Sequence, residues 1–304
     1  MSLHIGVGLP TTGRGPGFAE LGDVRAHAVL ADELGLESVW AADHLIPVVP
    51  IIDSTIALAA AAGATSRVKL GFSVMVIAMR PLAWAAKQIG SLQHVSGGRV
   101  LLGVGSGGVP HGTAGWEAAG VPFAERGART DAALAALPGL LAGEATVLPH
   151  EPGRPKATLT PSAAVPPILV GGNGKVALRR ALEYGDGWFP SAIAPRTLAR
   201  QVARLREEAA EKGRPAPVVT VGVPAVLGGG RAEREAVAAA VAQGYGVPPE
   251  EAREIPVSGD AREAAEQLAA YAEAGAERAV LMTDRPDWTR HFERMAEVNA
   301  LLNG

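Results

Sequence analysis

The sequence predicts one α/β domain over residues 1–304, a (β/α)8 TIM barrel with insertions. Short apolar runs of strand type alternate with longer segments of helical apolar spacing, and eight such runs occur along the chain. The alternation indicates a parallel sheet, because parallel strands need crossover segments between them. No internal repeat, linker or shift in composition divides the chain, and a barrel of this kind takes about 250 residues.

The eight predicted strands are, in chain order, 4–9, 37–41, 68–76, 99–104, 167–170, 186–189, 218–227 and 278–282. The predicted helices are 18–34, 53–64, 82–95, 123–141, one that begins at 175, 196–212, 231–243, 260–274 and 288–302. Gly35 should end the first helix, Asp53 is a good N-cap for the second, and Pro138 should kink or end the fourth. The segments 144–166, with five prolines and room for a small hairpin, and 228–259 are expected to be irregular insertions.

The apolar spacing also predicts which helical side chains face inward. They are Leu21, Val24, Ala28 and Ala31 in the first helix, and Val176, Leu178, Ala181 and Leu182 in the helix that begins at 175.

Composition excludes several classes of function. The net charge of −3 and the pI near 6.2 give no electrostatic reason to expect nucleic acid or an anionic membrane as a partner. The chain has no cysteine, which excludes disulfides, thiolate metal sites and cysteine nucleophiles, and no motif of metal ligands is present. Without a signal peptide or a run of about 18 apolar residues, we expect a soluble cytoplasmic protein.

The stretch 167–189 combines a strand, a glycine-rich turn and a helix. Gly171, Gly172, Asn173 and Gly174 follow the strand, and the helical spacing begins at Lys175. The N-terminus of a helix leaves backbone N–H groups without intrahelical partners, so this arrangement can hold an anion such as a phosphate. A tight turn that binds no ligand is the alternative interpretation.

In TIM barrels the chemistry takes place at the C-terminal ends of the strands. There the second strand offers Asp43 and His44, and a carboxylate beside an imidazole makes His44 a candidate acid or base. The alternative is a polar pair that caps the next helix. His111 is a weaker candidate in a nearby loop.

Residues 103–108 match the pattern G-x-G-x-x-G after the fourth strand. A dinucleotide site would need a helix directly afterwards, whereas Val109-Pro110-His111-Gly112 follows. We therefore interpret Gly105, Ser106 and Gly107 as a strand end where the backbone approaches a bulky ligand closely.

Several segments resemble the luciferase-like monooxygenase superfamily, in particular its branch that depends on the deazaflavin coenzyme F420. The segments are 37–44 (Glu-Ser-Val-Trp-Ala-Ala-Asp-His), 80–82 with 96–107, 120–129, 167–190 and 272–280. The resemblance spans nearly the whole chain and implies an eight-stranded barrel with insertions, in agreement with the strand count.

The resemblance implies a cofactor ring in the mouth of the barrel, backed by a non-proline cis peptide at Ser73–Val74. It places Asp43 and His44 near the reactive carbon of the ring, and Gly171 to Lys175 at the cofactor phosphate. It also implies an oxidoreductase that transfers a hydride between F420 and a small organic substrate, and we expect a homodimer.

Two other functions remain open. The same fold could bind FMN and act as a monooxygenase with reduced flavin and oxygen, or it could hold the cofactor without turning it over. The related sugar-phosphate dehydrogenases carry a catalytic glutamate where this chain has Gly108, so sugar-phosphate oxidation is not expected.

Overall fold

The strands of the computed structural model, which describes residues 3–12, 21–46, 50–108, 112–283 and 285–304, form a closed ring. In this part of the chain eight parallel strands pair in the order β9-β11-β1-β2-β3-β4-β7-β8, and β8 pairs with β9 to close the barrel. The ring consists of β1 (His4–Gly8), β2 (Ser38–Ala41), β3 (Lys69–Phe72), β4 (Val100–Val104), β7 (Ile168–Gly171), β8 (Gly187–Phe189), β9 (Val218–Leu227) and β11 (Arg278–Met282). The predicted (β/α)8 barrel is confirmed.

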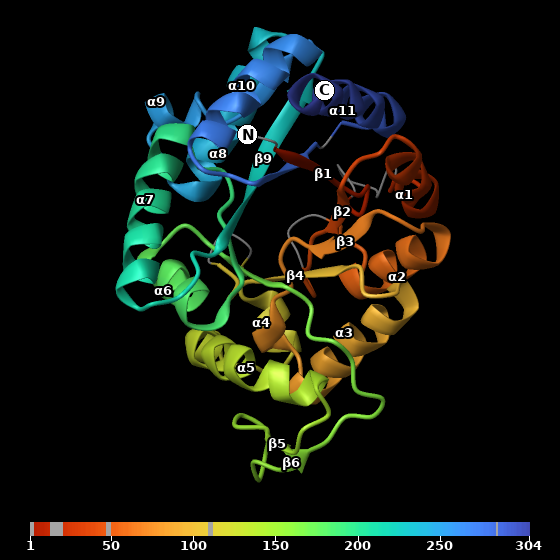
Figure 1. Ribbon diagram of the computed structural model, residues 1–304, viewed down its shortest axis with the longest axis vertical. Coiled ribbons are helices and arrows are strands. Elements are labelled where there is room, and N and C mark those ends of the chain that lie inside the picture. Colours follow the sequence, from red (N-terminus) through yellow and green to blue (C-terminus); the bar gives the residue numbers. More distant parts are fainter. Residues whose placement is uncertain (1–2, 13–20, 47–49, 109–111, 284) are drawn as a thin grey trace.

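Helices surround the ring on its outer side (Figure 1). They are α1 (Val24–Glu33), α2 (Ser54–Ala64), α3 (Leu82–Ser96), α5 (Arg126–Leu141), α6 (Lys175–Tyr184), α7 (Pro195–Glu211), α8 (Arg231–Tyr245), α9 (Pro249–Ala252), α10 (Ala261–Glu273) and α11 (Trp288–Asn303). The short α4 (Ala114–Ala118) instead packs on residues 45–46 after β2 and on Gly107 after β4, and the chain also forms the 3-10 helices η1 (Ile77–Met79) and η3 (Phe123–Glu125). None of the described helices is long and apolar enough to cross a membrane.

Both predicted insertions contain additional strands. The segment 144–166 forms a small antiparallel hairpin of β5 (Thr146–Val147) and β6 (Lys156–Ala157), which lies at one end of the molecule beyond α3 and α5 (Figure 1). In the segment 228–259, β10 (Val257–Gly259) pairs in parallel with the last residues of β9, outside the ring.

The hydrophobic core has an outer and an inner layer. The large outer layer lies between the strands and the helices. The inner layer fills the barrel with Trp40, Leu101, Leu169, Phe189 and Val280, and the rings of Trp40 and Phe189 meet edge to face at 5.1 Å. Below this layer, Arg278 donates two hydrogen bonds to Glu37, at 2.8 and 2.7 Å, and one to Thr220. A polar plug therefore closes the N-terminal end of the barrel.

The prediction was wrong at the start of the first helix. We expected helix over 18–34, but α1 begins at Val24, because the Asp23 carboxylate caps it by accepting a hydrogen bond from Ala26 N–H. Leu21 precedes the helix and is 40% exposed instead of facing inward. Residues 13–20 lie outside the described part of the chain.

Two further boundaries differ from the prediction. The third strand ends at Phe72 instead of Val76. Gly71 pairs with Leu101 and Met75 pairs with Val104, so the third strand has one residue more than its partner between these two pairs. The extra residue makes a bulge, which interrupts the strand. Pro138 lies inside α5 without ending it, since only the last turn remains and that turn buries Leu140 and Leu141.

The inward face predicted for α6 needs one correction. Val176 is 54% exposed, whereas Leu178, Ala181 and Leu182 are buried. Val176 is the second residue of the helix and lies at the edge of the buried stripe, beside the glycine turn.

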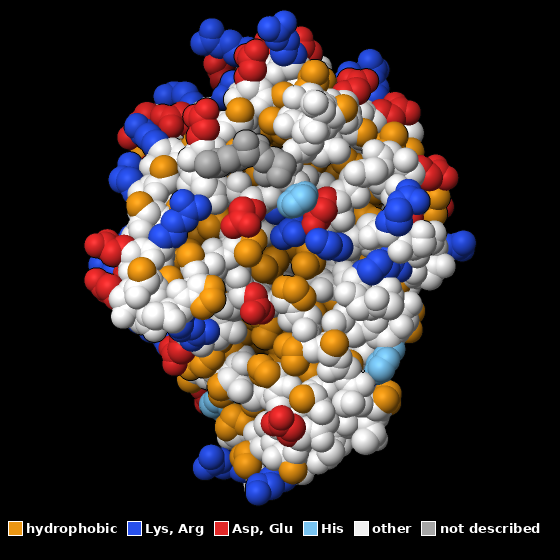
Figure 2. All heavy atoms as spheres, in the orientation of Figure 1, with side chains coloured by type: hydrophobic (Ala, Val, Ile, Leu, Met, Phe, Trp, Pro, Cys, Tyr) orange, Lys and Arg blue, Asp and Glu red, His pale blue; other side chains and the backbone are white. Residues whose placement is uncertain are grey.

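Charged residues of the surface are unevenly distributed. On the face shown in Figure 2, Lys, Arg, Asp and Glu side chains gather along the upper and lateral margins and also occur near the centre and at the lower tip, whereas hydrophobic side chains gather in the middle and lower half. Positive and negative side chains are interspersed on this face, and the net charge of the chain is small, so no large area of a single sign is present there.

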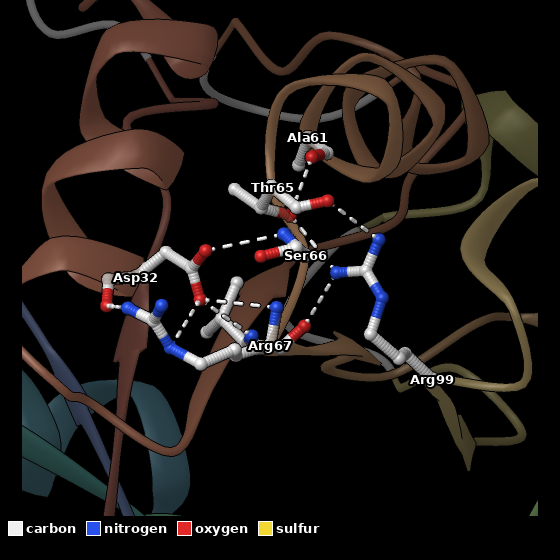
Figure 3. A network of polar contacts seen from close by, with 7 residues as sticks. Asp32, Ala61, Thr65, Ser66, Arg67 and Arg99 are labelled. Carbon is white, nitrogen blue, oxygen red and sulfur yellow. Dashed lines mark hydrogen bonds and ion pairs between the residues drawn. The ribbon is translucent and has the colours of Figure 1, made fainter.

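A polar network joins α1, α2 and the starts of β3 and β4 (Figure 3). The buried Asp32 carboxylate accepts hydrogen bonds from the backbone N–H groups of Ser66, Arg67 and Val68, at 2.8–3.2 Å. Arg99 donates to the carbonyl oxygens of Ala62, Thr65 and Val68 and so satisfies the end of α2. These contacts lie at the N-terminal face of the barrel, which serves stability in TIM barrels.

We predict that Asp32→Ala lowers the free energy of unfolding by about 2 kcal/mol, because three backbone N–H groups lose their acceptor. Burial alone would raise the pKa of Asp32, but the N–H groups of Ser66 and Val68 and the charge of Arg67 lower it below 3.8. A lowered folded-state pKa gives stability that is fully present above the unfolded-state pKa and is lost as pH falls through the folded value.

Urea unfolding from about pH 3 to 7 measures this contribution, and Glu33→Ala, an exposed change on the same helix, is the control. The difference between Asp32→Ala and the parent should be constant above about pH 5 and shrink below it. A difference equal to that of Glu33→Ala at every pH would contradict the role given to Asp32.

Candidate functional site

The residues predicted for the site follow four strands that are neighbours in the ring. Asp43 and His44 follow β2, Ser73 and Val74 follow β3, residues 105–107 follow β4, and residues 172–175 follow β7. Parallel strands bring their C-terminal ends to one edge of the barrel, which we call the mouth. The structure thus brings these segments together on adjacent strands. His111, the weaker candidate, lies outside the described residues.

A bulge at residues 73–75 shapes the mouth beside β3. The Ser73–Val74 peptide is cis, as the resemblance implied. Ser73 N–H donates to Ala41 O at 2.9 Å and Met75 N–H donates to Gly103 O at 2.8 Å, so the bulge is tied to both neighbouring strands. The Ser73 hydroxyl is buried and has no hydrogen-bond partner among the described residues.

The side chain of Val74 occupies the middle of the mouth. A Cβ atom on Gly105 would lie 2.4 Å from Val74 Cγ2, and one on Gly171 would lie 3.0 Å from Val74 Cγ1. Only glycine at these two positions leaves room for the valine. Gly107 has a φ of +68°, and a Cβ there would contact Trp116. The glycines after β4 are therefore required by packing within the protein itself.

The turn after β7 is held from two sides. Trp188 Nε1–H donates to Gly172 O at 2.8 Å, and Asn173 exchanges two hydrogen bonds with the backbone of Ser191, at 2.8 and 3.1 Å. Gly172 has a φ of +118°, which side chains disfavour. Helix α6 then begins at Lys175 without a side-chain cap, and Lys175 is exposed.

Asp43 is 3% exposed and accepts four hydrogen bonds. They come from Nη1 and Nη2 of Arg80 at 2.7 and 2.6 Å, from Val76 N–H at 2.8 Å and from Ser54 Oγ at 3.0 Å. The next residue, His44, is half-buried at the mouth. The sequence analysis gave Arg80 no role, because its partner lies 37 residues away and no spacing rule connects the two.

The barrel interior below the mouth is apolar. Trp40 and Phe189 lie next to Val74 and the half-buried Met282. The mouth therefore presents an apolar floor, a buried hydroxyl, a half-buried imidazole and a helix N-terminus on one rim. Among the described residues, no three His, Asp or Glu side chains converge as metal ligands would.

The sequence matches the luciferase-like monooxygenase family over residues 3–287. The chain belongs to this family. The match covers all eight strands of the ring.

Curated relatives of the chain include two named enzymes and one uncharacterised protein. The chain is 31% identical over 189 residues to 5,10-methylenetetrahydromethanopterin reductase of Methanolobus tindarius, covering 62% of this chain and 56% of that protein. It is 34% identical over 205 residues to F420-dependent glucose-6-phosphate dehydrogenase of Beutenbergia cavernae, covering 63% and 60%. An uncharacterised protein of Mycobacterium tuberculosis is 39% identical over 170 residues, covering 55% and 58%. The chain thus spans less than two thirds of the length of each.

Among solved structures of the same fold, one holds an F420 adduct and another holds FMN. An F420-dependent secondary alcohol dehydrogenase in complex with an F420–acetone adduct superposes with a TM-score of 0.82 at 20% identity, with both chains covered completely. The oxygenating constituent of 3,6-diketocamphane monooxygenase from Pseudomonas putida, in complex with FMN, superposes with a TM-score of 0.78 at 18% identity and covers 99% and 98% of the two chains. At these identities the likeness establishes the fold alone.

Proposed function

We propose that this chain is an oxidoreductase that transfers a hydride between coenzyme F420 and a small organic substrate. The observation that carries the proposal is the floor of the mouth, where Val74 lies among glycines beside the unpartnered Ser73 hydroxyl. The curated relatives named F420-dependent glucose-6-phosphate dehydrogenase support F420 over FMN.

The residues of the mouth fit the flat ring of a deazaflavin. The Val74 side chain and the apolar layer of Trp40 and Phe189 beneath it offer a surface against which an aromatic ring can stack. A buried hydroxyl without a partner costs free energy unless it finds one, and the polar edge of a bound ring would supply it for Ser73. Gly105, Ser106 and Gly107 would border the ring on the β4 side.

The turn after β7 fits the phosphate of the cofactor. Gly171, Gly172, Asn173 and Gly174 leave the uncapped N-terminus of α6 open to solvent, and Lys175 adds a positive charge there. Backbone N–H groups and the helix dipole favour an anion at this position.

F420 supplies the hydride chemistry when it is bound. We give His44 the transfer of a proton to or from the substrate, because an imidazole is a suitable acid or base near neutral pH. Asp43 would act indirectly, since its carboxylate oxygens are already occupied by four donors. Gly108 carries no acid, so we do not propose a sugar-phosphate substrate.

An FMN-dependent monooxygenase is the second candidate, because the fold also occurs in a structure that holds FMN. Titration of the purified chain with F420 and with FMN, each followed by fluorescence, discriminates the two. We expect tighter binding of F420 and oxidation of reduced F420 by members of a panel of enones and imines. Preference for FMN, with oxygen consumption, would replace the proposal by the monooxygenase, and F420 binding without any turnover would indicate a cofactor-binding protein.

We predict that His44→Ala lowers turnover by about 10²–10⁴-fold, because a positioned acid or base contributes a rate factor of this size. The dissociation constant of F420 should remain nearly unchanged. Steady-state kinetics and a cofactor titration measure the two quantities separately. A parallel loss of cofactor binding would show that His44 shapes the pocket instead of moving a proton.

We predict that Gly172→Val abolishes most of the affinity for F420, because valine disfavours a φ of +118° and its branched side chain blocks the anion. Lys175→Ala should weaken binding only severalfold, since an exposed lysine contributes about 1 kcal/mol or less. Titration of both variants, with their melting temperatures as a control for folding, tests this order. Variants that bind F420 like the parent and only melt earlier would make the turn structural.

We also propose that two copies of the chain pair through the outer sides of α2 and α3. No charged residue occurs in α2, and Ile56 and Trp84 are 69% and 67% exposed. Each is the third residue of its helix, and the two helices are neighbours. A two-fold axis would let Trp84 of one copy cover Ile56 of the other.

Light scattering at micromolar concentration should give twice the chain mass of 31.1 kDa for the parent and the single mass for Ile56→Glu combined with Trp84→Glu. A monomeric parent would refute the pairing.

A further inference from the structure

We propose that Arg80 is a positioning residue of the mouth. Through Asp43, it fixes the segment that carries His44 and the segment that carries Ser73–Val74 relative to each other. This inference rests on the proposed function, because it assigns a role within the same site.

The contacts of Asp43 join four segments of the chain. Asp43 lies two residues after the end of β2, at the mouth, and directly precedes His44. Val76, which donates its N–H to Oδ2 at 2.8 Å, is two residues beyond Val74. Ser54, whose hydroxyl donates to Oδ1 at 3.0 Å, is the first residue of α2. Arg80 directly follows η1 and donates to both carboxylate oxygens.

Arginine is the residue type that suits this arrangement. Its planar guanidinium donates two parallel hydrogen bonds to one carboxylate, which fixes the orientation of the carboxylate as well as its charge. The other oxygen lone pairs are then directed at Val76 N–H and Ser54 Oγ. A lysine would supply a single charged donor and leave the carboxylate free to turn.

Because Asp43 is buried, its carboxylate depends on these hydrogen-bond partners. The Asp43 side chain is 2% exposed, so its charge needs a partner. Asp53 is a second, more distant ion-pair partner of Arg80, at 3.7 Å. A loosened carboxylate would therefore shift the backbone after β2 and the bulge after β3 together. In the proposed complex, the cofactor ring lies between the backbone after β2 and the bulge after β3.

Arg129 offers a matched control. Arg80 and Arg129 line the same small cleft between η1, α5 and residues 148–151. Their side chains are 21% and 23% exposed, and each forms an ion pair. The partner of Arg129 is Glu125, four residues away on the surface, and this hydrogen-bonded ion pair involves neither residues 43–46 nor residues 73–76.

The experiment compares Arg80→Lys with Arg129→Lys in the purified full chain. We expect Arg80→Lys to weaken F420 binding about tenfold or more and to move the absorption band of bound F420 toward that of free F420, because a site about 1 Å too loose loses its geometry. Arg129→Lys should change neither, since a surface pair contributes little. Equal affinity and identical bands for the two variants would overturn the proposal.

A second variant separates positioning from simple neutralisation of charge. In Arg80→Gln combined with Asp43→Asn, no buried charge is left unpaired, so the melting temperature should recover relative to Arg80→Gln alone. We expect F420 affinity to remain low, because the amide pair does not reproduce the four hydrogen bonds. Recovery of both stability and affinity would overturn the positioning role.

A parent chain that binds no F420 would refute the proposed function but not the role of Arg80. Hydrogen exchange then decides it without a cofactor. Faster exchange of the amides in 43–46 and 73–76 in Arg80→Lys than in Arg129→Lys, at equal global stability, supports the inference. Equal exchange in the two variants would overturn it.

Discussion

The space inside the barrel constrains everything built on it. Eight short parallel strands leave room for only a few large side chains, and the fully buried Trp40 is one of them. A Cβ on Gly6 would lie 2.5 Å from Trp40 Nε1, and one on Gly71 would lie 2.1 Å from Trp40 Cε3. The indole therefore fits only because two neighbouring strands carry glycine. The polar plug of Arg278 and Glu37 closes the lower end, so the remaining space lies above, at the mouth.

The plug also shows how charge is tolerated inside the barrel. Burial alone would raise the pKa of Glu37, but the hydrogen bonds and charge of Arg278, together with Lys69 and Ser38, lower it to about 2. Asp43 at the opposite end likewise has an arginine as its bidentate partner. The two carboxylates thus lie on opposite sides of the apolar layer, and an arginine donates hydrogen bonds to both oxygens of each.

The fold was largely readable from the sequence because each strand is a short apolar run between glycines or polar residues. The strands β9 and β11 have the predicted bounds, and Asp53 caps α2 as expected. Periodicity could not choose between possible caps, so the start of α1 was misplaced, and it could not show the extra residue that ends β3 early.

The candidate site was readable only in part, for a different reason. The rule that parallel strands end at one edge placed the segments after β2, β3, β4 and β7 together, and the resemblance supplied the cis peptide at Ser73–Val74. The pairing of Arg80 with Asp43 depends on how η1 folds back after the bulge, which no local pattern encodes. The roles of these residues toward a ligand stay predictions until a cofactor is bound.

The two insertions differ in how they are attached to the barrel. The β5–β6 hairpin pairs only with itself and joins the barrel through neighbouring helices. By contrast, β10 extends the main sheet along β9, and Ala252 and Ile255 pack against Ala192 and Ala194, directly after β8. Tyr271 adds hydrogen bonds to Ile193 O and Ile255 O. Segment 144–166 is thus anchored to the outer helices, where Leu148 is buried and Glu151 accepts a hydrogen bond from Leu82 N–H, whereas segment 228–259 extends the main sheet and supports the backbone that follows β8.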